Sequence, residues 1–305
     1  MTELAIATER LVKRYGRARG LAGLDLEVHR GEVYGFLGPN GAGKTTTIRL
    51  LLDLIRPTSG RVTVLGVDPR RDGVALRRRV GYLAGEFVVD GRQTGRELLT
   101  YLGNLRGGVA GASIDQLAER LELDLRRKIG SLSKGNRQKL GLVQAFMHAP
   151  ELLILDEPTS GLDPLLQREF IAMAREAKQA GRTVFMSSHV LSEVQQTADR
   201  VGIIQEGRLV AAERVEALRE RAVRKVELHF EAPVSVEEFA ALPGVSHVRV
   251  DGTVLRCRLM GRADALVKAA SRHTVVDLRV EEPDLEERFL ASYRDDAGEG
   301  GNRAA

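Results

Sequence analysis

Residues 38–45, GPNGAGKT, constrain the fold of this chain more than any other stretch. They fit the pattern G-x-x-x-x-G-K-[ST], follow the strand-like run EVYGFL and open the helix-like run KTTTIRLLLDLI. Gly38, Gly41 and Gly43 allow the backbone to curl so that its amide groups point inward, and the helix start adds its positive end. Lys44 is expected to reach the β- and γ-phosphates, and the Thr45 hydroxyl is placed to bind Mg²⁺. The segment therefore predicts a nucleoside-triphosphate site at the end of a strand.

Around this loop, strand-like and helix-like segments alternate, which is typical of an α/β fold with a parallel sheet. The run LLIL at residues 152–155 is continuously apolar, as expected for a central strand buried on both faces. Strand signals stop from about 86 to 149, where Thr94 with Glu97, and Ser113 with Gln116, have capping-box spacing. The sequence predicts an α/β domain over residues 1–220 with a helical insert at about 86–149.

The pattern changes again after about residue 220. Residues 221–293 have the order β-α-β-β-α-β, which predicts a small α+β, ferredoxin-like domain with a hairpin turn at Asp251–Gly252. The amphipathic segment PDLEERFLASY, residues 283–293, is expected to form a final helix, and the polar, Gly-rich residues 294–305 a disordered tail. Such a fold carries many functions and identifies none by itself.

Polar side chains follow two of the apolar strands. Asp156 and Glu157 come directly after residues 152–155, and His189 ends the run VFMSSH. Ligands in open α/β sheets bind beyond the carboxyl ends of the strands. Asp156 suits Mg²⁺, and Glu157 suits a base that polarises water for attack on the γ-phosphate, a role contributing roughly 10²- to 10⁴-fold in rate. We expect His189 to reach the γ-phosphate, so Lys44, Glu157 and His189 are the candidate catalytic residues.

A second candidate phosphate site lies in LSKGN, residues 132–136. Ser133 is a good N-cap and hydroxyl donor, and Gly135 lets backbone amides approach an anion. Apolar residues Leu140, Val143 and Met147 anchor the following helix on one face. The alternative is an ordinary capped helix without a ligand.

In this order the motifs resemble those of the ATP-binding cassette, or ABC, ATPase family, a P-loop NTPase fold, over roughly residues 4–215. GPNGAGKTT looks like the family's Walker A loop, LLILDEP its Walker B strand, LSKGN its signature and SGLD its D-loop, and His189 matches its switch histidine. The resemblance implies ATP and Mg²⁺ as cofactors, with the metal at Thr45 and Asp156. It assigns the nucleotide contacts to Tyr15, Gly38, Pro39, Asn40, Gly41, Ala42, Gly43, Lys44, Thr45, Thr46, Ser133, Lys134, Gly135, Asn136 and Asp163.

In this family two cassettes pack head to tail, with each ATP between one Walker A loop and the partner's signature. Both half-sites look complete here, which favours a homodimer, while a heterodimer stays open. The family usually has Gly where Lys134 stands and Gln where Asn136 stands. It also places a Mg²⁺-contacting Gln at about Gly85, and whether Glu86 replaces it is open.

Residues 221–293, closing with EPDLEERFLASY, resemble the extension on ATP-binding subunits of ABC-2 type exporters, among them drug and antibiotic efflux systems of the daunorubicin-resistance kind. This implies an ATPase that drives a separate integral membrane permease, which binds the small-molecule substrate. No apolar run approaches the length of about 18 residues needed to span a bilayer. The single cysteine, Cys257, cannot form an internal disulfide, so we expect a cytoplasmic protein. The resemblance implies that it is peripheral on the inner face of the membrane, through the permease.

The formal net charge of +4 and the pI near 9.3 permit an acidic partner. The arginine clusters are short and the chain has no tryptophan, which favours a solvated basic face, so no nucleic-acid partner is expected. A soluble ABC ATPase acting on nucleic acid or ribosomes remains the alternative, although one cassette without a heptad run counts against it. A third hypothesis is a nucleotide-gated binding or immunity protein that hydrolyses ATP slowly.

Overall fold

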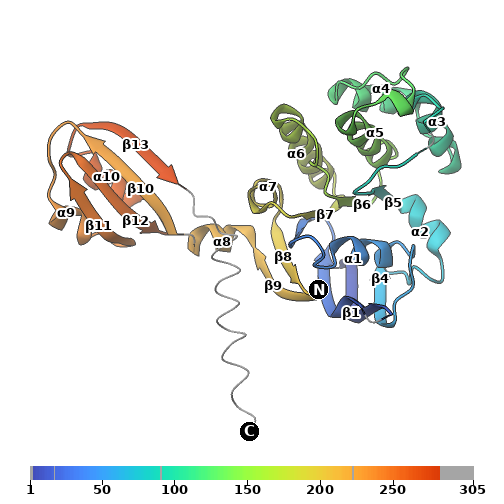
Figure 1. Cartoon of the computed structure of the whole chain (residues 1–305), viewed down its shortest axis with the longest axis horizontal. Helices are drawn as coiled ribbons and strands as arrows, with labels where there is room; N and C mark the ends of the chain where they lie inside the picture. Colours follow the sequence, from blue (N-terminus) through green and yellow to red (C-terminus); the bar gives the residue numbers. More distant parts are fainter. Residues whose placement is uncertain (1–2, 17, 90, 222, 282–305) are drawn as a thin grey trace, which may run out of the picture. The chain divides into compact units, whose positions relative to one another are not determined.

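The computed structural model describes residues 3–16, 18–89, 91–221 and 223–281. The chain divides into two compact units, Met1–Glu213 and Arg214–Ala305. The sequence-based prediction had placed this boundary seven residues later, after residue 220. Figure 1 shows the elements of both units. The expected final helix at 283–293 and the expected disordered tail at 294–305 lie outside the described residues.

The centre of the first unit is a six-stranded sheet with the order β5-β6-β7-β3-β8-β9. Its pairings β3–β7, β3–β8, β5–β6 and β6–β7 are parallel. All residues of β3, β6 and β7 are buried, and the apolar run at residues 152–155 predicted this for β6. The strands are β3 (Val33–Leu37), β5 (Val80–Leu83), β6 (Leu152–Asp156), β7 (Thr183–Ser188), β8 (Arg200–Gln205) and β9 (Arg208–Arg214).

Helix α1 (Lys44–Leu51) packs on one side of this sheet, while α6 (Pro164–Gln179) and α7 (Leu191–Thr197) pack on the other (Figure 1). Beyond α1 lies a second, antiparallel sheet of order β2-β1-β4, formed by β1 (Leu4–Tyr15), β2 (Ala18–His29) and β4 (Ser59–Val64). The main core fills the space between the two sheets, with Phe36, Ile48 and Ile154 among its fully buried side chains. Helix α2 (Gly73–Arg79) contacts β5.

The described residues between β5 and β6, where the sequence predicted a helical insert, contain helices and no strand. It consists of α3 (Gly95–Leu105), α4 (Gly111–Arg120), the 3₁₀ turn η1 (Ile129–Ser131) and α5 (Lys134–Phe146). Thr94 and Glu97 form the expected capping box at α3. The second expected capping box is wrong, because α4 already begins at Gly111 with Ala110 as N-cap, which places Ser113 inside the helix.

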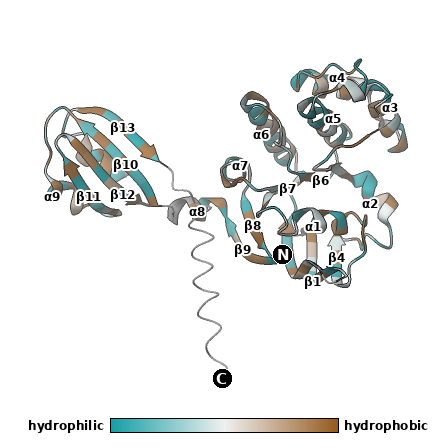
Figure 2. Cartoon of the chain, in the orientation of Figure 1, coloured by the Kyte–Doolittle hydropathy of each residue, from teal (hydrophilic) through white to brown (hydrophobic). Residues whose placement is uncertain are grey.

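The second unit begins with α8 (Val215–Arg221) and continues in the order β10, α9, β11, β12, α10, β13. Its antiparallel sheet has the order β11-β12-β10-β13. Hydrophobic and hydrophilic residues alternate along these strands (Figure 2), and the hydrophobic set packs against Phe239 of α9 and Leu266 of α10. The bounds are β10 (Val223–Phe230), α9 (Val236–Ala240), β11 (Val245–Asp251), β12 (Val254–Met260), α10 (Asp264–Ala270) and β13 (Val275–Glu281).

The β11–β12 hairpin turns where the sequence expected it. Asp251 pairs with Val254, so Gly252 and Thr253 form the two-residue loop, and Gly252 has a φ of 61°. None of the described helices is both long and apolar enough to cross a lipid bilayer.

Candidate nucleotide-binding and catalytic site

The loop at residues 38–43 connects β3 to α1 and runs back over the end of the parallel sheet. Gly38 N donates to Ser188 O at the end of β7, over 3.2 Å. Gly41 and Gly43 have φ values of 81° and 113°, a region that side-chain-bearing residues rarely adopt. A Cβ atom on Gly43 would also lie 2.8 Å from Gly20 O, so the close approach of β2 to the loop requires glycine there.

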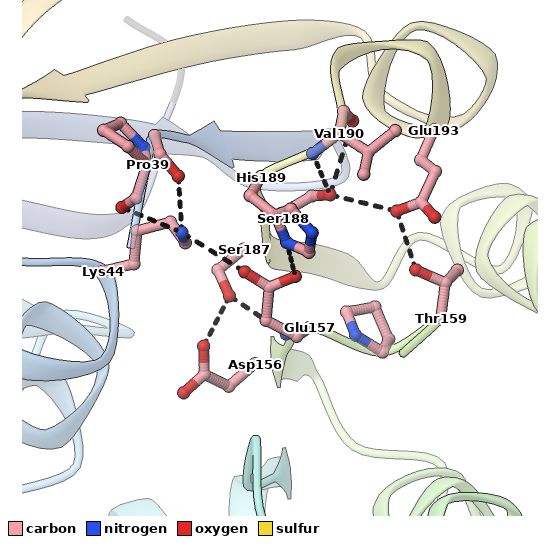
Figure 3. Close-up of polar contacts among 12 residues, drawn as sticks. Pro39, Lys44, Asp156, Glu157, Thr159, Ser187, Ser188, His189, Val190 and Glu193 are labelled. Atoms are coloured by element: carbon pink, nitrogen blue, oxygen red, sulfur yellow. Dashed lines mark hydrogen bonds and ion pairs between the residues drawn. The ribbon is translucent and has the colours of Figure 1, made fainter. Parts of the chain in front are cut away.

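Lys44 opens α1, and its side chain is only 5% exposed. Its Nζ donates to Gly38 O at 2.5 Å and Pro39 O at 3.3 Å, and forms an ion pair of 3.2 Å with Glu157 Oε1 (Figure 3). The ammonium group therefore lies between the loop and the end of β6. A cation at this position can neutralise an anion that the loop amides bind.

Asp156 and Thr45 are neighbours, as the expected metal site requires. Thr45 Oγ1 donates to Asp156 Oδ2 at 2.8 Å, and Ser187 Oγ donates to Asp156 Oδ1 at 2.5 Å. Asp156 is 2% exposed. No cluster of three or more His, Cys, Asp or Glu side chains able to hold a metal occurs among the residues that the structure covers. One carboxylate and one hydroxyl fit Mg²⁺, which binds a few protein oxygens and takes its other ligands from phosphate and water.

Glu157 follows β6 with its backbone in the left-handed region, at φ 51°. Its N–H donates to Ser187 Oγ at 3.0 Å, and Oε2 lies 2.8 Å from His189 Nδ1 (Figure 3). The two carboxylate oxygens therefore face different partners, Lys44 on one side and His189 on the other. This arrangement brings together the three side chains that the sequence singled out for catalysis.

The imidazole of His189 is 54% exposed, and the chain around it is held by a polar network. Glu193 Oε2 accepts from Thr159 Oγ1 at 2.7 Å and from Ser188 Oγ at 3.0 Å. These bonds join the loop after β6 to the start of α7 next to His189. The sequence did not single out Thr159, Ser188 or Glu193, because their meeting depends on how α7 packs on the sheet.

Ser187 is another site residue that the motifs do not contain. It pairs with Asp156 in the parallel register of β6 and β7, and its hydroxyl bonds both to the Asp156 carboxylate and to the Glu157 amide. Only that register identifies Ser187, and no local sequence pattern specifies it.

Residues 132–136 begin α5 as expected, with Ser133 as the N-cap that accepts from Asn136 N at 3.2 Å. A Cβ atom on Gly135 would lie 2.8 Å from Gly161 O, so this segment touches the expected D-loop of the same chain. One turn later, Gln138 Nε2 donates to Glu157 O at 3.0 Å and to Pro158 O at 3.1 Å. Across the described part of the chain, no hydrogen bond or ion pair joins Ser133, Lys134, Gly135 or Asn136 to the loop at 38–46.

Asp163 has a structural partner within the chain. It is the N-cap of α6, and Oδ1 accepts from Leu165 N at 3.0 Å and Leu166 N at 3.1 Å. Its other carboxylate oxygen has no hydrogen bond to a described residue.

Tyr15 lies at the edge of the loop and is 47% exposed. A Cβ atom on Gly20 would contact both Tyr15 Cε2, at 2.9 Å, and Thr46 Cγ2, at 3.3 Å, so the ring lies near the first turn of α1. Lys13 Nζ is 5.2 Å from the ring centroid. An exposed aromatic face beside the loop is available for stacking on a planar ligand.

Gly85 adjoins the metal-suited carboxylate, since a Cβ atom there would lie 3.2 Å from Asp156 Oδ2. Glu86 is exposed, and its carboxylate makes no hydrogen bond or ion pair with any residue that the structure describes. Burial raises the pKa of Tyr82, which lies in β5 four residues before Glu86, and the nearby Asp156 charge raises it further.

A glycine-rich loop after the central strand β3, a buried lysine, and two carboxylates at the end of β6, which β7 separates from β3, define a P-loop nucleoside triphosphatase. Residues 21–160 match the family described as "ABC transporter". Bacitracin transport ATP-binding protein BcrA of Bacillus licheniformis is 35% identical, covering 93% of this chain and 96% of the relative. Daunorubicin resistance ATP-binding protein DrrA3 of Streptomyces coeruleorubidus is 36% identical, covering 97% of this chain and 98% of the relative.

A solved structure described as the ATP binding subunit of an ABC transporter aligns with a TM-score of 0.65 at 28% identity, covering 70% of this chain and 92% of that structure. The chain therefore belongs to the ABC transporter family of nucleotide-binding ATPase subunits.

Proposed function

We propose that this chain is the ATP-hydrolysing subunit of an ABC-2 type exporter that removes a drug or antibiotic from the cell. The carrying observation is that relatives named for bacitracin transport and daunorubicin resistance match over 93% and 97% of this chain, well beyond the cassette. A likeness confined to the ATPase domain would not separate an exporter from other ABC proteins. The length of the match favours the exporter over a soluble ATPase acting on nucleic acid or ribosomes.

In this proposal the loop amides and Lys44 bind the triphosphate of ATP, and Thr45 and Asp156 are the residues that would hold Mg²⁺. Mg²⁺ neutralises the charge of the phosphates when it is bound. Glu157 accepts a proton from the attacking water, whose oxygen bonds to the γ-phosphorus as the bond from that phosphorus to the β–γ bridging oxygen breaks and ADP leaves. His189 orients the Glu157 carboxylate through the bond at its Oε2. Tyr15 stacks on the base.

The arrangement of α5 supports a composite site in a head-to-tail dimer. Ser133 and Gly135 lie at the exposed start of a 13-residue helix, a position where backbone amides favour an anion. They make no polar contact with this chain's own loop at 38–46, among the residues described, so a second copy is the natural source of the phosphate they bind. We propose a homodimer with two such sites, which Lys134, Asn136 and Asp163 of each chain help to line.

We propose that the second unit is a ferredoxin-like domain. Its sheet order and the order of its helices and strands support this assignment. We propose that it adjusts the dimer rather than binding the transported compound. Substrate recognition belongs to a separate permease, through which the chain is held at the inner face of the membrane.

The test is affinity purification of the intact chain from detergent-solubilised membranes of its native cell, followed by mass identification of its partners. We expect one polytopic membrane protein in stoichiometric amount, and we expect it to raise ATP hydrolysis in reconstituted vesicles. Recovery of ribosomal proteins or nucleic acid instead would favour a soluble ABC ATPase that acts on nucleic acid or ribosomes.

A further inference from the structure

The second unit has an uncovered apolar groove on the helix-bearing face of its sheet. The groove has a volume of about 210 Å³ and lies between α10 and the edge strand β13. Its floor and walls include Leu228 of β10, Leu259 of β12, Leu266 of α10 and Leu278 and Val280 of β13. Leu278 is 51% exposed and Val280 48% exposed, although their cross-strand partners Leu228 and Val226 are buried.

The exposure follows from how the helices cover the sheet. Helices α9 and α10 bury the core-facing residues of β10 and β12, and the same face of β13 extends past them. An edge strand with exposed hydrophobic side chains is a site for pairing with another segment or chain. The groove therefore requires an occupant.

A polar group at the rim also lacks a partner. Arg224 lines the groove, and its Nη2 donates to Gly261 O. Its buried Nε–H has no hydrogen-bond partner among the described residues. Buried donors without partners are uncommon in native proteins, so the occupant is expected to bring an acceptor as well as apolar side chains.

We propose that this occupant is the chain's own segment 283–293, PDLEERFLASY. The chain leaves β13 at Glu281, opposite Lys225 and one residue past Val280, so the segment starts at the end of the groove where Arg224 lies. Eleven residues of helix extend about 16 Å, shorter than the seven residues of β13 at about 3.3 Å each. A helix reversing direction at Pro283 therefore fits along the strand.

The sequence of the segment offers both features that the groove requires, apolar side chains and a hydrogen-bond acceptor. Leu285, Phe289 and Tyr293 recur every four residues and form one apolar stripe on a helix. Glu286 lies beside that stripe, one turn from the start of the segment, whereas Glu287 points to the opposite side. Glu286 is the acceptor for Arg224, and the apolar stripe covers Leu278 and Val280.

The first experiment measures hydrogen–deuterium exchange of residues 283–293 in the full-length chain. We expect amide exchange at least about tenfold slower than in the same peptide alone. Leu278→Asp should abolish that protection, whereas Val276→Asp, on the same strand but outside the groove lining, should preserve it. Unprotected amides in the unmodified chain would overturn the proposal.

A charge exchange tests the contact itself without removing groove residues. Arg224→Glu should weaken the protection of residues 283–293, and adding Glu286→Arg should restore it. Adding Glu287→Arg instead should not restore it, because that side chain faces away. The assignment of Glu286 would be overturned if Glu286→Arg and Glu287→Arg restored the protection equally, or if neither substitution restored it. Protection that rises with protein concentration would overturn the own-chain occupant in favour of a second copy's segment.

Discussion

At Glu157 the backbone has a φ of 51°, a conformation that costs a non-glycine residue of order 1–3 kcal/mol and persists only where surrounding contacts enforce it. The contacts here are the bond from Glu157 N to Ser187 Oγ and the bonds from Gln138 to the oxygens of Glu157 and Pro158. They aim the carboxylate between Lys44 and His189. The strained backbone thus holds the Glu157 carboxylate in a fixed position, as a general base requires.

Glu157→Gln should keep this geometry while removing proton acceptance. We expect ATP binding to be retained and kcat to fall by roughly 10²- to 10⁴-fold. Single-turnover hydrolysis together with equilibrium nucleotide binding measures both effects. Glu151→Gln is the matched control, because Glu151 pairs with Arg79 on the surface just before β6. A variant that hydrolyses ATP at the normal rate would remove Glu157 from the chemistry.

Ser187 positions both carboxylates, so its loss should affect metal use and chemistry together. In Ser187→Ala, Asp156 Oδ1 and the Glu157 amide lose their shared partner. We expect kcat to fall about tenfold, with a higher Mg²⁺ concentration at half-maximal rate, since one lost buried hydrogen bond costs about 1–3 kcal/mol. Ser187→Thr keeps the hydroxyl and should recover most of the activity. An unchanged Mg²⁺ dependence in Ser187→Ala would contradict this role.

At the scale of elements, the local signals predicted the strands next to the nucleotide loop because those strands are short and fully buried. Strands β1 and β2 were missed. They are 12 residues each, mix apolar and charged residues, and their pairing shifts register at four places, so period-two alternation is lost. The sequence also missed Ser187 and Gln138, because their roles depend on register and packing rather than on motif spacing.

The two capping boxes show the same limit. Thr94 caps α3 as predicted, yet Ser113 does not cap α4, since the N-cap of α4 is Ala110, three residues earlier, and the helix buries Ile114 and Ala118. Burial of that face decides where the helix starts, and a polar pair of suitable spacing does not override it.

N-caps therefore offer a way to separate stability from function. Ser133→Ala and Thr94→Ala should each destabilise the insert by about 1 kcal/mol. Only Ser133→Ala should also weaken ATP-dependent dimerisation, measured by light scattering of Glu157→Gln backgrounds. Equal loss of dimerisation in both variants would assign Ser133 a structural role alone.

At the scale of the whole molecule, a partly buried polar cluster joins the helical insert to the parallel sheet. Arg106 Nη1, at the end of α3, donates to Val80 O at 3.1 Å and lies 2.8 Å from His148 Nε2. With its amide oriented to suit its neighbours, Gln144 of α5 accepts from Arg106 Nη2 and donates to Tyr82 O. The cluster thus joins α3 and α5 to β5.

This cluster predicts a pH dependence. Burial and the neighbouring Arg106 charge lower the pKa of His148 to about 4, from an unfolded value near 6.5. The unfolded chain therefore binds the proton more readily, so stability is lost as the pH falls from about 6.5 toward 4. Urea midpoints at pH 7 and pH 5 should differ less for His148→Gln than for the unmodified chain. Identical pH dependence would place the titration elsewhere.

One hydrogen-bonding amide has a consequence for the proposed dimer. Gln138 lies one turn into α5, the helix whose start is proposed to contact the partner's ATP, and its amide donates to the carbonyl oxygens of this chain's Glu157 and Pro158. In the proposed dimer, a shift of α5 when the partner's γ-phosphate leaves would therefore be passed to Glu157, the residue proposed to act on this chain's own ATP. Hydrolysis at one site of the proposed dimer is therefore expected to affect hydrolysis at the other, so that the two ATP molecules are hydrolysed in a coordinated rather than an independent manner.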